Sequence, residues 1–123
     1  MATKAGIIGA GGMLQYHAAG FREAGADIIA VCDLNKDAAD AAAAEYGIEN
    51  VFSDASEMLE KLPELEAVSV ITPNRFHKPV AVQLLEAGKH VFCEKPPALN
   101  AAEVSEMKTS AEAVGKILMF DFN

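Results

Sequence analysis

Gly9 and Gly11 lie between a short apolar stretch, residues 5–8, and a segment with helical character, a spacing typical of a phosphate-binding loop. Gly9 allows a tight turn out of the preceding strand, and Gly11 lacks the Cβ that would keep a pyrophosphate away from the backbone. The helix that follows presents free N–H groups and the positive end of its dipole to the phosphates. These residues therefore predict a dinucleotide site. Leu14 takes the third position of the fingerprint, where Gly or Ala is usual, and a glycine-rich turn without a ligand is the alternative.

Asp33 stands about 20 positions further on, at the end of a second apolar stretch, Asp27–Cys32. A carboxylate at this place accepts hydrogen bonds from the adenosine ribose hydroxyls and repels a 2′-phosphate, which favours NAD over NADP. Lys36 lies nearby and could attract a phosphate, but the carboxylate is better placed. The alternative interpretation is that Asp33 only starts a turn, since the sequence Asp-Leu-Asn-Lys is also good turn chemistry.

Two further polar motifs follow later apolar stretches. In residues 72–77, Asn74 and His77 offer hydrogen-bonding groups, although either could simply cap the next helix. In residues 93–97, Lys95 lies between Glu94 and two prolines, so its ammonium is positioned to donate to a substrate hydroxyl or carbonyl. A surface Glu-Lys pair in a turn is the alternative. Both motifs would lie at the carboxyl ends of strands, where ligands bind in parallel α/β sheets.

The elements that must position these residues alternate strictly between strand and helix. Short apolar runs between helices predict a doubly wound parallel α/β sheet of the Rossmann type, with strand order 3-2-1-4-5-6. The expected strands are Lys4–Ile8, Asp27–Cys32, Val51–Phe52, Ala67–Ile71, His90–Cys93 and Ile117–Phe120. The expected helix boundaries are Gly25 for the first helix, Asn35 and Gly47 for the second, Ser53 and Lys61 for the third, Pro79 and Gly88 for the fourth, and Asn100 and Gly115 for the fifth.

Composition limits the class of protein. The 123 residues suffice for one domain, residues 1–123, and the net charge of −8 argues against nucleic acid or an anionic membrane as partner. No apolar run approaches the ~18 residues of a membrane span, and the first strand begins too early for a secretory signal. Cys32 and Cys93 would be separated by two intervening strands, too far for a disulfide, which indicates free thiols and a cytoplasmic location.

Four motifs in order make the chain resemble the glucose–fructose oxidoreductase, inositol dehydrogenase and rhizopine catabolism (Gfo/Idh/MocA) family. They are Gly-Ile-Ile-Gly-Ala-Gly-Gly-Met, Val-Cys-Asp, Thr-Pro-Asn with His77, and Cys-Glu-Lys-Pro, the last being the most specific. The resemblance covers essentially the whole chain. It implies an NAD site formed by Gly9, Gly11, Gly12, Met13, Asp33, Leu34, Thr72, Pro73, Asn74, His77, Glu94, Lys95 and Pro96, and no metal is expected. It also implies that Lys95 contacts substrate as a catalytic residue.

Members of this family are typically more than twice as long, with a second α/β domain that completes the active site and usually forms the oligomer interface. The resemblance therefore implies the cofactor domain of a homo-oligomeric dehydrogenase that acts on a sugar, a polyol or a related hydroxy compound. The chain alone is expected to be inactive. Two other classes stay open: a non-catalytic NAD-sensing regulator, and a glycoside hydrolase that uses NAD transiently.

Overall fold

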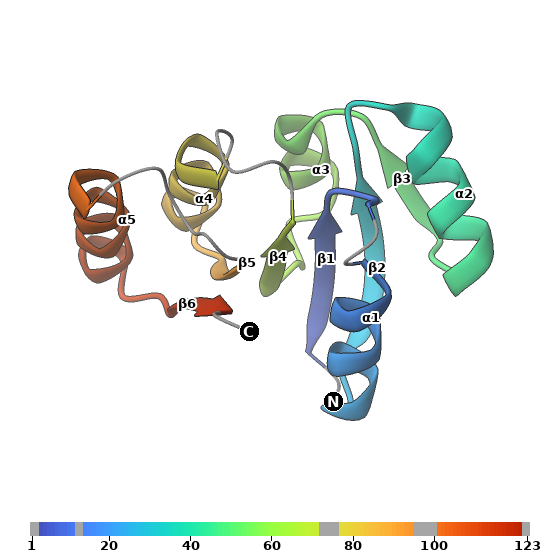
Figure 1. Ribbon diagram of the computed structural model, residues 1–123, viewed down its shortest axis with the longest axis horizontal. Helices are drawn as coiled ribbons and strands as arrows, with labels where there is room; N and C mark the ends of the chain where they lie inside the picture. The colour runs from blue at the N-terminus through green and yellow to red at the C-terminus, as the bar shows by residue number, and fades with distance from the viewer. Residues whose placement is uncertain (1–2, 12–13, 72–76, 95–100, 122–123) are drawn as a thin grey trace.

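A computed structural model of the chain describes residues 3–11, 14–71, 77–94 and 101–121. Its centre is a parallel sheet with strand order β3-β2-β1-β4-β5-β6, as the alternation of elements predicts (Figure 1). The strands are β1 (Lys4–Ile8), β2 (Asp27–Cys32), β3 (Asn50–Phe52), β4 (Ala67–Val70), β5 (His90–Glu94) and β6 (Leu118–Asp121). The helices are α1 (Leu14–Glu23), α2 (Lys36–Tyr46), α3 (Ala55–Lys61), α4 (His77–Glu86) and α5 (Ala101–Val114).

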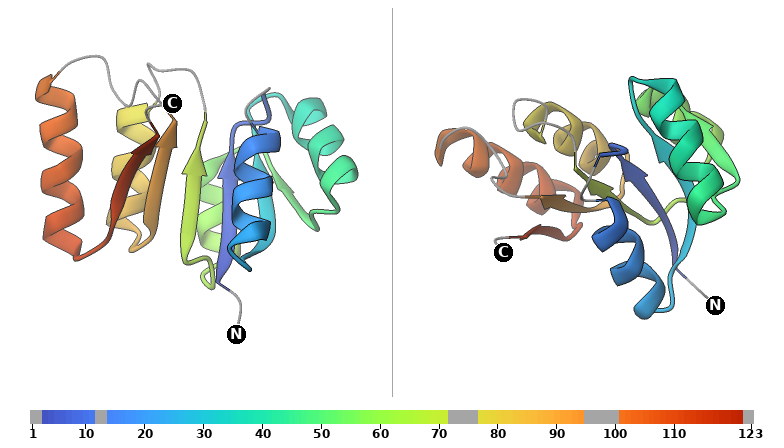
Figure 2. Two further views of the ribbon diagram at one scale, coloured as in Figure 1. Left: turned by 60° about the horizontal axis from the view of Figure 1, so that its bottom comes forward. Right: turned by 45° about the vertical axis from the view of Figure 1, so that its right-hand side comes forward.

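Helices cover the two faces of the sheet unequally. α1 and α2 lie on one face, over β1 to β3, and α3, α4 and α5 lie on the other (Figure 2). Two apolar clusters fill these layers, because alternate side chains of each strand point to opposite faces. Ile7 and Val31 pack toward α1 and α2, whereas Val68 and Val70 pack toward Met58 and the later helices. The strands therefore carry apolar residues on both faces, which explains their unbroken apolar runs.

Short polar residues and glycines set the helix boundaries. Asn35 caps α2 at its start, where its side chain accepts a hydrogen bond from Ala38 N, as expected. Gly47 ends the same helix in the left-handed conformation, with a φ of 68°. The cap predicted for α3 was wrong, because it lies one residue before the observed cap. Asp54, not Ser53, has the extended backbone of a cap, and its carboxylate accepts from Ser56 N.

The fourth helix also differs from expectation. α4 begins at His77, two residues before Pro79, the residue after which the helix was expected. Proline is tolerated in the first turn of a helix because the N–H groups there have no intrahelical partner. The proline was therefore misread as a boundary, and His77 is the first helical residue. The remaining strand boundaries agree with expectation to within one residue.

The two cysteines are buried free thiols, as expected. Cys32 is on β2 and Cys93 on β5, with β1 and β4 between them. Burial raises the pKa of each thiol from 9.0 to about 12, and nearby carboxylates including Asp54 add to the effect at Cys32. Since the thiolate is the reactive form, both side chains act as small apolar core residues at neutral pH.

Candidate dinucleotide-binding site

Gly9 makes the turn that leads out of β1. Its φ of +109° lies in a region that side chains rarely adopt, and a Cβ there would come 2.8 Å from Ile71 Cγ1 and 3.0 Å from the Ile71 carbonyl carbon. Its N–H donates to Cys32 O at 2.7 Å. The turn is therefore held between the ends of β2 and β4, and only glycine can occupy it. Ile71 was not among the residues expected at the site, because sequence spacing does not reveal this contact.

Gly11 is a glycine for a different reason. A Cβ added there would meet no atom of the described residues within 4 Å, and its backbone does not have a positive φ. In the part of the chain that the structure describes, neither packing nor backbone conformation therefore requires glycine at this position. Its carbonyl accepts from Leu14 N at 3.1 Å, so the loop leads directly into α1. Open space above a glycine at a helix N-terminus is what a pyrophosphate needs for close approach.

Leu14 replaces the small residue usual at the third fingerprint position. Its side chain is buried with Ile7, Ala18 and Val31 in the cluster beneath α1 and α2. The larger side chain is thus accommodated in the core of the α1 face. It contributes to the packing of α1 without closing the space above Gly11.

Asp33 joins the glycine loop to the start of α2. One carboxylate oxygen, Oδ2, accepts from Ala10 N at 2.7 Å, and the other, Oδ1, accepts from Asn35 N at 2.8 Å. The second contact is the turn interaction that was the alternative interpretation of this residue, and the first reaches across to the predicted phosphate loop. The turn interaction is therefore confirmed, and the contact with a ribose stays a prediction. Ala10 was not singled out in the sequence, since its contribution is a backbone N–H that any residue but proline supplies.

Lys36, the competing cation near Asp33, has an acidic neighbour of its own. Its ammonium lies 3.4 Å from Asp40 Oδ1, one helical turn further along α2, and both side chains are exposed. Such a pair is weak, but it reduces the positive potential near Asp33. Leu34 follows Asp33 with 81 % of its surface exposed, which places an apolar side chain at the edge where an adenosine would lie.

The later motifs are described only in part. His77 starts α4 and Glu94 ends β5, so both belong to the edge formed by the carboxyl ends of the strands. The other predicted site residues lie outside the described residues: Gly12, Met13, Thr72, Pro73, Asn74, Lys95 and Pro96.

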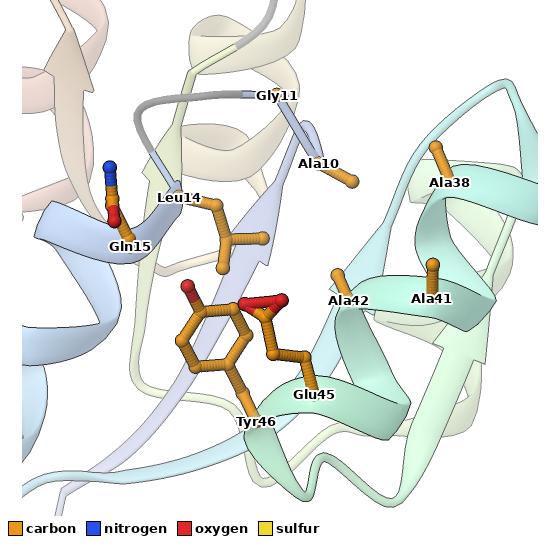
Figure 3. A pocket seen from close by; sticks show the side chains of 9 residues that line it. All are labelled: Ala10, Gly11, Leu14, Gln15, Ala38, Ala41, Ala42, Glu45 and Tyr46. Atoms are coloured by element: carbon orange, nitrogen blue, oxygen red, sulfur yellow. The ribbon is translucent and has the colours of Figure 1, made fainter.

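A cavity of about 510 Å³ opens beside the glycine loop, between α1 and α2 (Figure 3). Its walls are mostly small, including Ala38, Ala41 and Ala42 of α2. Glu45 and Tyr46 direct their polar atoms toward it in the close view. Glu45 is the charged residue among the described residues that line it.

Two other properties bear on the kind of site. In the described part of the chain, no three His, Cys, Asp or Glu side chains form a group that could hold a metal ion. Within the same residues, no helix has the length and apolar character needed to span a membrane.

A strand, a glycine turn open to a ligand, a helix N-terminus and an acidic residue just after the next strand together define a dinucleotide-binding domain. A family model described as "Oxidoreductase family, NAD-binding Rossmann fold" matches residues 3–122. The chain belongs to this Gfo/Idh/MocA family and is its NAD-binding domain.

The chain is similar to dehydrogenases of sugars and polyols. The chain is 42 % identical over 97 residues to D-glucoside 3-dehydrogenase of Escherichia coli (strain K12), covering 79 % of this chain and 27 % of that protein. It is 39 % identical over 104 residues to scyllo-inositol 2-dehydrogenase (NADP(+)) IolU of Bacillus subtilis (strain 168), covering 80 % and 31 %.

A solved structure shows the same fold with a cofactor bound. It is the WlbA dehydrogenase from Bordetella pertussis in complex with NADH and UDP-GlcNAcA, which superposes with a TM-score of 0.91 at 28 % identity. The match covers 98 % of this chain and 38 % of that one. The chain thus spans about a third of the length of the proteins it matches.

Proposed function

We propose that this chain, residues 1–123, is the NAD-binding domain of a dehydrogenase that acts on a sugar, a polyol or a related hydroxy compound. The observation that carries the proposal is the contrast between its two loop glycines. Gly9 is required by its backbone conformation and its approach to Ile71, whereas no contact among the described residues explains Gly11. A ligand pyrophosphate above Gly11 explains it.

The remaining predicted residues have roles that the family resemblance supplies. NAD, when bound, supplies a nicotinamide ring that accepts a hydride from the substrate C–H bond. Lys95 orients the substrate hydroxyl and stabilises negative charge as it develops on the oxygen. Thr72, Pro73, Asn74 and His77 line the path to the nicotinamide ribose, and Glu94 and Pro96 flank Lys95. The base that takes the hydroxyl proton would come from the part of the relatives that this chain does not match.

Preference for NAD over NADP is the finer part of the proposal. Asp33 would place a carboxylate beside a 2′-phosphate, Asp40 partly neutralises Lys36, and Glu45 adds negative charge to the adjoining cavity. Like charges at this distance disfavour the phosphorylated cofactor. The NADP(+)-dependent relative IolU shows that the fold itself does not decide the choice.

Calorimetry with NADH and NADPH tests this preference. We expect NADH to bind at least about tenfold more tightly, a difference of about 1.4 kcal/mol, and Asp33→Ala to narrow the gap. Asp37→Ala removes a nearby exposed carboxylate as a matched control and should leave the ratio nearly unchanged. Equal or tighter binding of NADPH by the wild-type chain would refute the role of Asp33 in selecting the cofactor.

The remaining proposals concern the setting of the whole protein. We propose a homo-oligomeric cytoplasmic enzyme with a small-molecule substrate and without nucleic acid or membrane partners. The net charge of −8 supports the exclusion of anionic partners. The substrates named for the relatives, a glucoside and an inositol, support the substrate class.

A further inference from the structure

Asp33 is a candidate for a second role because both of its carboxylate oxygens already have partners within the protein. Oδ2 accepts from Ala10 N, in the middle of the glycine loop, and Oδ1 accepts from Asn35 N. A residue that served only to read a ribose would not need to contact the loop that holds the pyrophosphate. Hydrogen bonds to a charged acceptor are roughly twice as strong as neutral ones, so the Ala10 contact restrains the loop.

The carboxylate is itself held in place by the sheet. Asp33 N donates to Phe52 O at 3.1 Å, which continues the pairing of β2 with β3 beyond the end of β2. Asn35, which donates to Oδ1, also caps α2 through its side-chain contact with Ala38 N. A rigid backbone and a helix cap thus fix the Asp33 side chain from two directions.

The described residues of the glycine loop make few other hydrogen bonds to β2 and the turn that follows it. Gly9 N donates to Cys32 O, and the chain returns to regular structure where Leu14 N donates to Gly11 O. Between these two points, among the described residues, the Ala10–Asp33 hydrogen bond joins the loop backbone to the turn that follows β2. Gly11 has no side chain that could pack against the protein and help to order the loop.

We propose that Asp33 is a positioning residue for the phosphate-binding loop, in addition to any contact that it makes with the ribose. This inference rests on the proposed dinucleotide site. The two roles are compatible, since each carboxylate oxygen can accept a second hydrogen bond. The positioning role makes an unusual prediction: a negative charge close to the phosphates would strengthen their binding, because the ordering of the loop outweighs the repulsion.

The test uses a ligand that Asp33 cannot read directly. 2′,3′-Dideoxyadenosine 5′-diphosphate keeps the adenine and the diphosphate but lacks the ribose hydroxyls. Its affinity for the ¹⁵N-labelled chain is measured by NMR titration beside that of ADP, for the wild type, Asp33→Ala and Asp33→Asn. Asp37→Ala, an exposed carboxylate in the first turn of α2, is the matched control for lost charge.

We expect Asp33→Ala to weaken binding of the dideoxy ligand about tenfold. This is the loss expected if the population of the binding-competent loop conformation falls to about a tenth of that in the wild type. Hydrogen exchange of the Ala10 amide should accelerate while that of Ile7 in β1 stays slow. Asp33→Asn keeps one acceptor oxygen for the two N–H donors, so its affinity for the dideoxy ligand should lie between those of the wild type and Asp33→Ala. If Asp33→Ala does not fold, this milder variant provides the comparison. Asp37→Ala should leave the affinity equal or slightly higher.

If both Asp33 variants bind the dideoxy ligand as tightly as the wild type or more tightly, the positioning role is wrong. The loss of repulsion between the carboxylate and the diphosphate would then explain the result by itself. A weakening confined to ADP would also overturn the positioning role and leave only the ribose contact. Failure of the proposed function looks different: the wild-type chain would then bind neither ADP nor NADH.

Discussion

The two loop glycines show how one residue type can serve two physical purposes. Gly9 answers a demand of the folded chain, a positive φ and a close approach to Ile71. Gly11 answers no demand of the described structure and leaves room for something else. The spacing of the two glycines after the first strand predicts these separate roles, and the structure adds the close approach of Gly9 to Ile71.

Alanine at each glycine should therefore give opposite results. Gly9→Ala should lower the free energy of unfolding by about 3 kcal/mol, because it combines backbone strain with overlap at Ile71. Gly11→Ala should change the free energy of unfolding by less than about 0.5 kcal/mol but weaken NADH binding at least about tenfold. Urea denaturation and NADH fluorescence measure the two quantities. Unchanged NADH affinity in Gly11→Ala would show that no phosphate approaches this residue.

Lys95 carries the prediction for chemistry in the complete enzyme. Lys95→Met should preserve the fold and most of the NADH affinity but lower kcat roughly 10²-fold, since one charge-stabilising group is lost. The measurement is steady-state turnover on the substrate of the full-length protein. If kcat is unchanged, Lys95 has a structural role only.

At the scale of elements, local capping chemistry decides where each helix begins, and neighbouring candidates are easily confused. Ser53 and Asp54 are adjacent, exposed and both good capping residues. Asp54 is the cap because its backbone is extended immediately before the first helical residue. The cap of α2 was predictable because the residue that follows Asn35 is not a good capping residue.

Paired variants separate these two candidates. Asp54→Ala should lower the free energy of unfolding by about 1 kcal/mol, because Ser56 N loses its acceptor at the start of α3. Ser53→Ala should change it by less than about 0.5 kcal/mol. Urea denaturation of the two variants provides the comparison, and an equal loss in both would mean that the serine shares the capping role.

On the scale of the whole molecule, the sheet has one face that is covered over only part of its width. α1 and α2 lie over β1 to β3, and beyond α1 a hollow of about 280 Å³ is bordered by Tyr16, Phe21 and Phe92. Beneath it His17 Nδ1 lies 3.0 Å from Ser69 Oγ, a buried polar contact between α1 and β4. Tyr16 is 63 % exposed, and β6 has a neighbouring strand on one side only. An apolar hollow next to a sheet edge favours association.

We therefore expect the 123-residue chain to bind NADH, to lack dehydrogenase activity and to self-associate with rising concentration. The phosphate loop and Asp33 are present, but the chain covers only about a third of the dehydrogenases it matches. NADH titration, turnover over a panel of sugars and polyols, and sedimentation at several concentrations check the three expectations. Robust turnover by this chain would contradict the view that catalysis needs a further domain.

The sequence by itself determined the alternation of strands and helices, the strand order and the place of the phosphate loop. These follow from local signals: apolar runs of strand length, capping residues, and glycines at fixed spacing after the first strand. The helix start at His77 was missed because a proline in a first turn looks like a boundary.

Only the tertiary structure decided how the site is held together. Ile71 and Gly9 are 62 positions apart, and Ala10 and Asp33 are 23 apart, so no local pattern reveals that they touch. The parallel sheet brings them together, because β2 and β4 are the two neighbours of β1 and all three strands end at the same edge. That adjacency distinguishes a glycine required by packing from one left open for a ligand, and it places the Asp33 carboxylate against the phosphate loop.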